Sequence, residues 1–143
     1  DDNTAEAFHE KCNYKGATII VAKVTNSEQI IGGYNPLFWD SSDSSKSTKD
    51  SFLFSFTNRT DPQSAKVGYS NNDQYSMYCS SSHGPQFGYG GNLVCQNGLW
   101  YSNYYDNNYF YPKIDNNYSY PKIDIPQGNV NVDDYEVFQV IRK

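Results

Sequence analysis

Residues 16–34 read GATIIVAKVTNSEQIIGGY, and this stretch predicts the centre of the fold. Its first half is apolar and rich in β-branched residues, a composition that suits a strand buried on at least one face. Asn26 and Ser27 favour a turn, and the apolar run resumes at Ile30 and Ile31 before Gly32. We therefore predict an antiparallel hairpin. Because a lone hairpin is marginally stable in water, the other strands are expected to pack on or beside it.

The composition of the chain favours a single, mostly β domain that spans residues 1–143. The 143 residues include 14 Tyr and 8 Phe together with many Asn, Ser and Gly turn formers, which is typical of sheets rather than helices. A net charge of -5 without a basic cluster argues against nucleic acid as a partner. No run approaches the ~20 apolar residues of a transmembrane helix, so we expect no membrane span.

The cysteines and the termini bear on the compartment. Three cysteines are an odd number and show no CxxC spacing, which favours reduced thiols in a cytoplasmic protein. The glycosylation triplets at Asn58 and Asn117 leave secretion as the alternative. The chain begins at Asp1 rather than Met, so we expect a processed product or a piece excised from a larger protein.

Further elements are predicted around the hairpin. A helix of about three turns, capped by Asn3 or Thr4, is expected to turn Phe8 and Cys12 toward the core and to stop near Gly16. Short strands are predicted at 52–56, 65–69, 74–80, 92–95 and 99–101.

The polarity of two further segments predicts their structure. Residues 41–50 read SSDSSKSTKD, which is too polar to bury and predicts a mobile surface loop. Residues 135–141 read YEVFQVI, with apolar side chains on both faces of the expected strand. That pattern predicts a strand in the interior of a sheet rather than at its rim.

Two loops stand out. Residues 83–91 read HGPQFGYGG, and four glycines and a proline in nine residues predict a tightly shaped loop. It lacks the Lys-Ser/Thr and the strand-to-helix context of a phosphate-binding loop. The chain then repeats itself, as DNNYFYPKI at 106–114 and DNNYSYPKI at 115–123. A nine-residue unit is too short for a helical solenoid, so we interpret the repeat as a duplication that lengthened a surface loop.

Few residues suggest chemistry. His9, Cys12, Cys79 and His83 are weak candidates for a Cys2His2 zinc site, but their spacing matches no strong metal signature. No pattern marks an activated thiol, a glycosidase pair or a calcium loop. We therefore expect no cofactor and no catalytic residue, and an enzyme centred on His83 with a cysteine or carboxylate is the alternative. The tyrosines and asparagines of residues 101–120 suggest a carbohydrate-binding platform.

Six pieces of sequence, in order, resemble the TLDc domain of the oxidation-resistance family. They are FHxxCxxKG at 8–16, IGGY at 31–34, Trp39, FLFS at 52–55, HGPxFG at 83–88 and DDYEVFQV at 133–140. The chain is most similar to versions found in lower-eukaryote BTB and kinase-associated proteins. It departs from them by lacking the family's usual leading segment, of the type Leu-Tyr-x-x-Ser-x-x-Gly, and by carrying the tandem repeat.

This resemblance implies a two-sheet antiparallel β-sandwich with one or two short helices and without an established catalytic mechanism. It also implies a cytoplasmic protein-interaction module that protects against oxidative stress and regulates the vacuolar proton pump as its protein partner. The alternative is a secreted, lectin-like sandwich that binds carbohydrate. As the contact surface we predict the glycine loop and the tyrosine tract, namely His83, Gly84, Pro85, Phe87, Gly88, Tyr89, Tyr109, Tyr111, Tyr118 and Tyr120.

Overall fold

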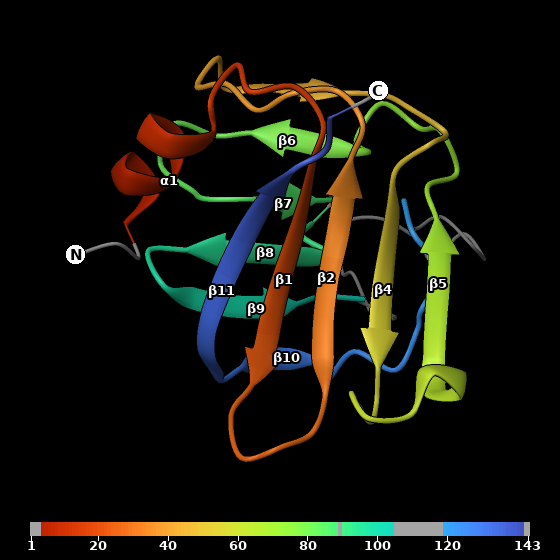
Figure 1. Ribbon diagram of the computed structural model, residues 1–143. Coiled ribbons are helices and arrows are strands. Elements are labelled where there is room, and N and C mark those ends of the chain that lie inside the picture. Colours follow the sequence, from red (N-terminus) through yellow and green to blue (C-terminus); the bar gives the residue numbers. More distant parts are fainter. Residues whose placement is uncertain (1–3, 89, 105–118, 142–143) are drawn as a thin grey trace, which may run out of the picture.

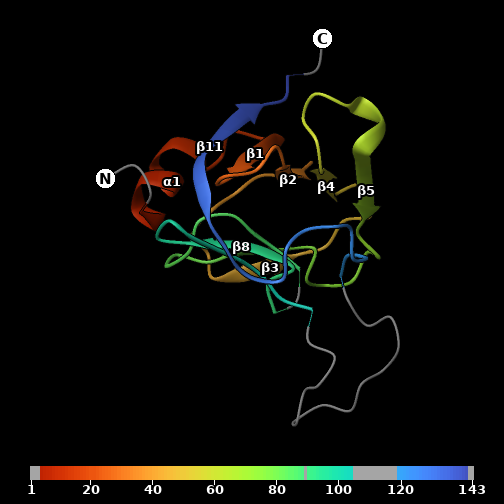
Figure 2. The ribbon, with the colours of Figure 1, turned by 90° about the horizontal axis from the view of Figure 1, so that it is seen from below.

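The protein is a sandwich of two antiparallel β-sheets. The computed structural model describes residues 4–88, 90–104 and 119–141. One sheet has the order β11 (Val132–Gln139), β1 (Thr18–Val24), β2 (Ile30–Asn35), β4 (Phe52–Phe56) and β5 (Ala65–Tyr69). The other has the order β10 (Gly128–Val130), β9 (Leu99–Ser102), β8 (Leu93–Gln96), β7 (Gln86–Phe87), β6 (Met77–Cys79) and β3 (Ser44–Lys46). Figures 1 and 2 show the two layers packed face to face, which confirms the predicted fold class.

The predicted hairpin is confirmed as β1 and β2, at the centre of the five-stranded sheet. Its register pairs Ile20 with Gly33 and Ala22 with Ile31, and Ile20, Ala22 and Ile31 are fully buried. Their side chains face the six-stranded sheet across a core that also holds the largest buried side chains of the chain, among them Trp39, Phe87, Met77, Leu93 and Tyr120. The apolar run therefore fixes which face of the sheet is inside.

The predicted helix is confirmed as α1 (Ala5–Cys12), which closes one side of the sandwich beside β11 (Figure 1). The Thr4 hydroxyl caps it by accepting a hydrogen bond from the Ala7 N–H at 3.0 Å. Phe8 and Cys12 are buried as expected. The helix is shorter than the predicted three turns, because Asn13 has extended backbone, whereas Gly16 turns the chain toward β1 with φ of +74°. The Asn3 alternative lies outside the described residues.

The prediction of a mobile loop at 41–50 is wrong in its centre. Ser44–Lys46 forms β3, which pairs Ser44 with Cys79 and Lys46 with Met77 along β6. Edge pairing uses backbone groups and needs no apolar side chain, so the polar composition did not reveal it. The Lys46 ammonium also lies 3.0 Å from the Asp40 carboxylate, which neutralises the charge of both groups close to the core.

The prediction that the last strand lies in a sheet interior is also wrong. β11 is the edge strand of its sheet and pairs only with β1 among the described residues. On its inner side, Tyr135 and Val137 pack against the core. On its outer side, Phe138 is 50% exposed. Both sides are apolar, but only one is covered.

The aromatic alternation predicted for residues 52–56 is confirmed in β4. Leu53 and Ser55 are fully buried and face the core, so the three phenylalanines form the opposite face of the sheet. The Phe52 ring lies between those of Tyr34, at 5.2 Å, and Tyr69, at 5.3 Å, on the neighbouring strands. An η1 turn (Pro62–Ser64) then leads into β5, and the β8–β9 hairpin turns at Asn97 and Gly98 as predicted.

Candidate functional site

The glycine loop is a structural element rather than an exposed surface. Phe87 is 1% exposed, and its ring packs edge-on against those of Trp39, at 5.5 Å, and Tyr120, at 6.2 Å. Gly88 has φ of +89°, and a Cβ there would collide with the Asn92 side chain. The glycines thus permit close packing under the loop.

Five members of the predicted contact surface are buried, and the contact surface as a whole stays a prediction. The buried members of that set are Gly84, Pro85, Phe87, Gly88 and Tyr120. These residues expose little surface to a partner of the folded domain. His83 is half-buried, and its Nδ1 lies 3.0 Å from the hydroxyls of Ser80 and Ser82. The remaining members, Tyr89, Tyr109, Tyr111 and Tyr118, lie outside the described residues.

Two tyrosines of the predicted carbohydrate platform, Tyr104 and Tyr120, are buried, whereas Tyr101 is half-buried. Tyr104 is 7% exposed, and Tyr120 is fully buried with its hydroxyl 2.6 Å from the Ser76 carbonyl oxygen. Neither ring offers a face to a carbohydrate. The tandem repeat up to residue 118 lies outside the described residues.

The four metal-ligand candidates do not gather into a site. The His9 Nε2 lies 2.6 Å from the carbonyl oxygen of Ser80 and 2.7 Å from that of His83, so this ring ties α1 to the segment after β6. Within residues 4–88, 90–104 and 119–141, no three His, Cys, Asp or Glu side chains could hold an ion together.

The three cysteines are free thiols inside the core. Burial raises the pKa of Cys12 to about 11, although the Lys11 and Lys15 ammonium groups lower it. Burial likewise raises the pKa of Cys95 to about 11 and that of Cys79 above its usual value. Because the thiolate is the nucleophile, these neutral thiols are poorly suited to covalent chemistry.

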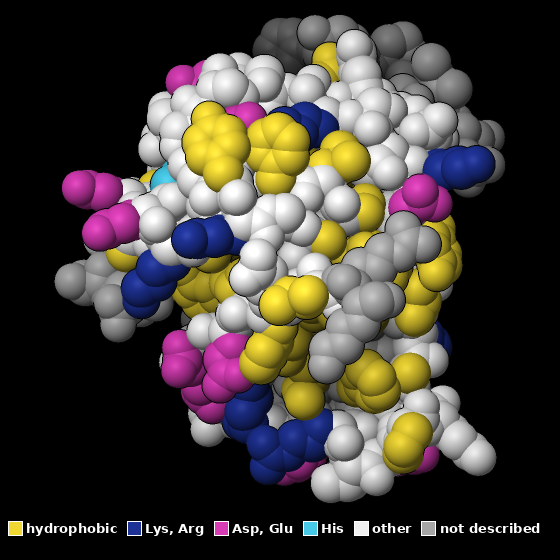
Figure 3. Space-filling model, turned by 45° about the horizontal axis from the view of Figure 1, so that its top comes forward, with side chains coloured by type: hydrophobic (Ala, Val, Ile, Leu, Met, Phe, Trp, Pro, Cys, Tyr) yellow, Lys and Arg dark blue, Asp and Glu magenta, His cyan; other side chains and the backbone are white. Residues whose placement is uncertain are grey.

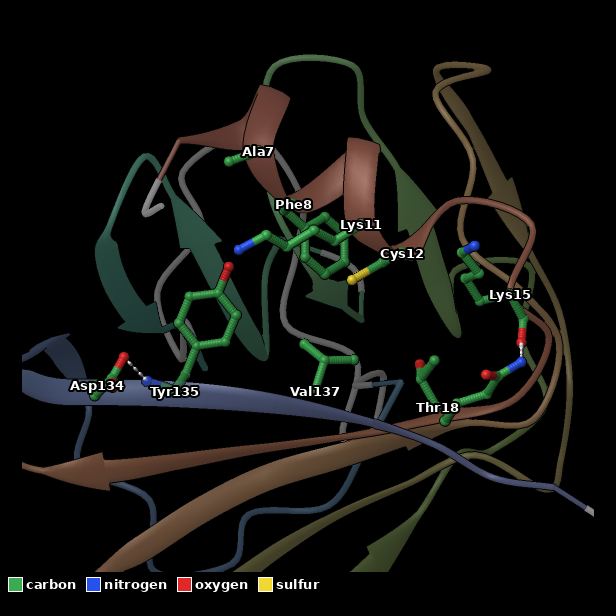
Figure 4. Close-up of a pocket in the computed structure, with 10 residues that line it drawn as sticks. Ala7, Phe8, Lys11, Cys12, Lys15, Thr18, Asp134, Tyr135 and Val137 are labelled. Carbon is green, nitrogen blue, oxygen red and sulfur yellow. Dashed lines mark hydrogen bonds between the residues drawn. The ribbon is translucent and has the colours of Figure 1, made fainter. Parts of the chain in front are cut away.

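A cleft of about 440 Å³ lies between α1 and the inner side of β11 (Figure 4). Its floor is apolar, because Phe8 and Cys12 from the helix and Val137 from the strand line it. Clefts of this size hold small ligands or a few side chains of a partner. Figure 3 shows the place as a recess with hydrophobic side chains between Lys/Arg above and Asp/Glu below.

Charged and polar groups surround this floor. Lys11 and Lys15 line the helix side, and Asp134 lies at the start of β11. Figure 4 shows the Tyr135 hydroxyl pointing toward the Lys11 amine. At the other end the Gln139 amide donates a hydrogen bond to the Lys15 carbonyl oxygen at 2.7 Å. The cleft is therefore positive along the helix and negative at one end of the strand.

The backbone of β11 borders the same cleft with an unpaired edge. The Val140 N–H donates to the Ala17 carbonyl oxygen at 2.8 Å, and Phe138 pairs with Ile19. In an antiparallel ladder, bonding residues alternate, so the even-numbered residues of β11 bond to β1 and the odd-numbered ones are directed away from it. No strand of the described ranges pairs with this outer edge of β11.

Sequence reasoning missed this cleft, although both of its walls were predicted as elements. The signals were the apolar helix face with Phe8 and Cys12, and the strand with apolar residues on both sides. Neither signal shows that the helix lies beside a sheet edge, because residues of the two walls, such as Cys12 and Val137, are more than 110 residues apart in the chain.

The described ranges contain one α-helix, of eight residues, which is not long and apolar enough to span a membrane. Comparison with curated proteins gives no match. The family model described as the TLDc domain matches residues 1–141, which is essentially the whole chain. The motifs quoted above thus lie within one continuous match, and the chain belongs to the TLDc domain family.

Proposed function

We propose that this chain is a non-enzymatic protein-interaction module that acts in oxidative-stress protection by binding and regulating the vacuolar proton pump. Its family is associated with oxidative-stress proteins. The observation that carries the proposal is the cleft between α1 and β11, where a recessed apolar floor, two lysines and an unpaired strand edge meet. Such a combination suits a protein ligand, because apolar area supplies affinity and polar groups at the rim fix orientation.

The buried thiols support a non-catalytic role. Peroxide reduction by cysteine requires an accessible thiolate, whereas burial raises the pKa of each thiol described above. The His83 ring has serine hydroxyls as its neighbours rather than an acid or a thiol. Three free cysteines in the core also support a cytoplasmic location, since thiols persist in a reducing compartment.

The pump assignment is tested by direct binding. Immobilised chain is exposed to the purified, detergent-solubilised vacuolar proton pump, and ATP-driven acidification of pump-containing vesicles is followed with and without the chain. We expect saturable binding and a changed acidification rate. The double variant Lys11→Glu, Lys15→Glu should weaken binding, whereas Lys49→Glu, at an exposed lysine outside the cleft, should not. Absent binding would refute the pump assignment, and equal binding of all three proteins would refute the cleft as the contact site.

The non-enzymatic part has its own assay. Hydrogen peroxide is added to the reduced chain, and its consumption is compared with that of the variant in which all three cysteines are replaced by serine. We expect no turnover beyond a stoichiometric reaction. Sustained turnover that disappears in the serine variant would show a thiol peroxidase and contradict this part of the proposal.

A further inference from the structure

We propose that the α1–β11 cleft binds an extended, acidic segment of a partner protein, which adds to the five-stranded sheet as a strand alongside β11. This inference rests on the proposed function as a protein-binding module and names the chemistry of the segment that it recognises. Three features support this inference: the direction of the backbone groups of β11, the apolar floor of the cleft, and the charges of Lys11 and Lys15 beside it.

The backbone of β11 determines the conformation of the ligand. Residues Tyr135, Val137 and Gln139 direct their peptide groups away from β1, as the register shows. The Tyr135 N–H is already bonded to the Asp134 carboxylate at 2.8 Å, which leaves the peptide groups of Val137 at the centre of the open edge. Regularly spaced donors and acceptors of this kind are matched by an extended chain lying about 4.8 Å away.

The cleft floor determines one side chain of the ligand. The side chains of Tyr135, Val137 and Gln139 point to the inner side of the sheet and line the cleft. A partner residue opposite Val137 directs its own side chain the same way, because opposite residues share a face. That side chain meets Phe8 and Cys12, so an apolar residue is required there.

The lysines determine the charge of the ligand. Lys11 points toward Tyr135 and lines the cleft at one end of the open edge (Figure 4). Lys15 lines the other end, where its carbonyl oxygen accepts the Gln139 hydrogen bond and its amine points away from Gln139. Along an extended chain the next side chains on the same face are two residues away. An acidic residue two positions from the apolar one, opposite Tyr135, would therefore lie near the Lys11 amine, and one on the other side would lie in the half of the cleft that Lys15 lines. The recognised pattern is acidic–x–apolar–x–acidic.

The acidic residues of β11 restrict where such a segment lies. Asp133 is bonded to the Lys23 ammonium at 3.0 Å, which partly neutralises it, but Asp134 is directed to the cleft. An acidic ligand is therefore repelled from the start of the strand and favoured between Tyr135 and Gln139. This matches the open part of the backbone edge.

The test measures binding of a synthetic peptide, Thr-Asp-Thr-Leu-Thr-Asp-Thr, to the chain by fluorescence anisotropy. Three comparison peptides are used: one with lysine in place of both aspartates, one with alanine in place of leucine, and one with N-methyl-leucine. The last retains every side chain but removes the donor that would bond to the Val137 carbonyl oxygen. We expect each change to weaken binding about tenfold, a loss within the range of one net hydrogen bond or one buried leucine.

Protein variants test the same contacts from the other side. Val137→Pro removes one edge N–H, and proline is tolerated at edge strands when that N–H faces away from the sheet. Lys11→Glu with Lys15→Glu reverses the charge, and Phe138→Ala, on the exposed outer side, is the control. We expect tenfold weaker binding for the first two and no change for the control. Thermal melts confirm that each variant is folded, and amide hydrogen exchange at Val137 and Gln139 should slow when the peptide binds.

Several results would overturn the inference. Equal affinity for the N-methyl peptide, or unchanged exchange at Val137, excludes strand addition. Equal affinity for the lysine peptide excludes acidic recognition. A concentration-dependent dimer in analytical ultracentrifugation that Val137→Pro dissociates shows a second copy in the cleft instead. If the peptide does not bind but the intact pump does, this inference is wrong and the proposed function stands; if neither binds, both are wrong.

Discussion

Replacing Tyr120 by phenylalanine removes one hydroxyl from the centre of the sandwich. This side chain is fully buried, and burial raises the pKa of its phenol above its usual range. The hydroxyl donates to the Ser76 carbonyl oxygen at 2.6 Å and lies 2.7 Å from the Ser51 hydroxyl. It thus joins the start of β4 to the segment before β6. The ring, which packs against Phe87, stays in place.

The expected cost follows from what the former partners retain. The Ser76 carbonyl oxygen also accepts a hydrogen bond from the Gly88 N–H at 3.2 Å, and the Ser51 hydroxyl can still donate to the Tyr34 carbonyl oxygen at 2.7 Å. Neither partner is left wholly unsatisfied, so the loss is close to that of ordinary hydrogen bonds rather than of a stranded buried group. We expect the free energy of unfolding to fall by about 1–2 kcal/mol. Tyr120→Ala, which also removes the ring, should cost about 3–5 kcal/mol.

Urea unfolding followed by tryptophan fluorescence measures both values, provided that the slope of the transition is unchanged. Tyr69→Phe, at a tyrosine that is 59% exposed, is the control and should change the free energy by less than about 0.5 kcal/mol. If Tyr120→Phe were as stable as the parent while Tyr120→Ala lost less than about 1 kcal/mol, Tyr120 would not be buried as described. Its original assignment to the contact surface would then be restored.

Three further changes test other parts of the fold. Gly33→Ala should lower the free energy of unfolding by about 1–3 kcal/mol, because a Cβ there would lie 2.7 Å from the Phe87 ring. In the Phe87→Leu background the same change should cost less, and equal costs in both backgrounds would contradict the clash. Burial alone would raise the pKa of Asp40, but hydrogen bonds from Ser42 and the Lys46 ammonium lower it to about 2. An Asp in the unfolded chain has a pKa of about 3.9, so ionised Asp40 stabilises the fold above that pH. This contribution to the free energy of unfolding is lost as the pH falls toward 2. Asp40→Asn should therefore reduce the difference between urea midpoints at pH 6 and pH 2.5, and an unchanged difference would rule out this role. Finally, the three buried thiols should react with a disulfide reagent at pH 8 only as fast as the protein opens, and urea should expose all three; immediate reaction in the folded protein would contradict their burial.

Local sequence signals predicted the elements that depend on neighbouring residues. The hairpin of β1 and β2 follows from two apolar runs and a turn, and the helix follows from the Thr4 cap and the spacing of Phe8 and Cys12. Both lie in the first 35 residues of the chain and need no information from elsewhere. The β3 strand could not be predicted in this way, because its pairing with β6 uses backbone groups that every residue carries.

The glycine loop shows why buried residues were included in the predicted contact surface. A high density of glycine indicates that other atoms come close to the backbone, but it does not say which atoms. Here they are atoms of the same domain, namely the Asn92 side chain beside Gly88 and the Cys95 backbone beside Gly84. The HGPxFG motif therefore has a packing role, because it places Phe87 in the core.

The apolar pattern of β11 predicted an interior strand, but at a sheet edge the same pattern favours pairing with a further strand. An edge strand in water is usually interrupted by charges, and Asp133, Asp134 and Glu136 provide them at its start. Beyond Glu136 the strand continues as Val137–Phe138–Gln139, which has the composition of an interior strand although no described strand covers its outer edge. The sequence pattern is thus that of a strand with two neighbours, whereas the fold supplies one. A second strand from a partner would resolve this difference, and Lys11 of α1, together with Lys15 between α1 and β1, lines the cleft where an acidic strand would be favoured.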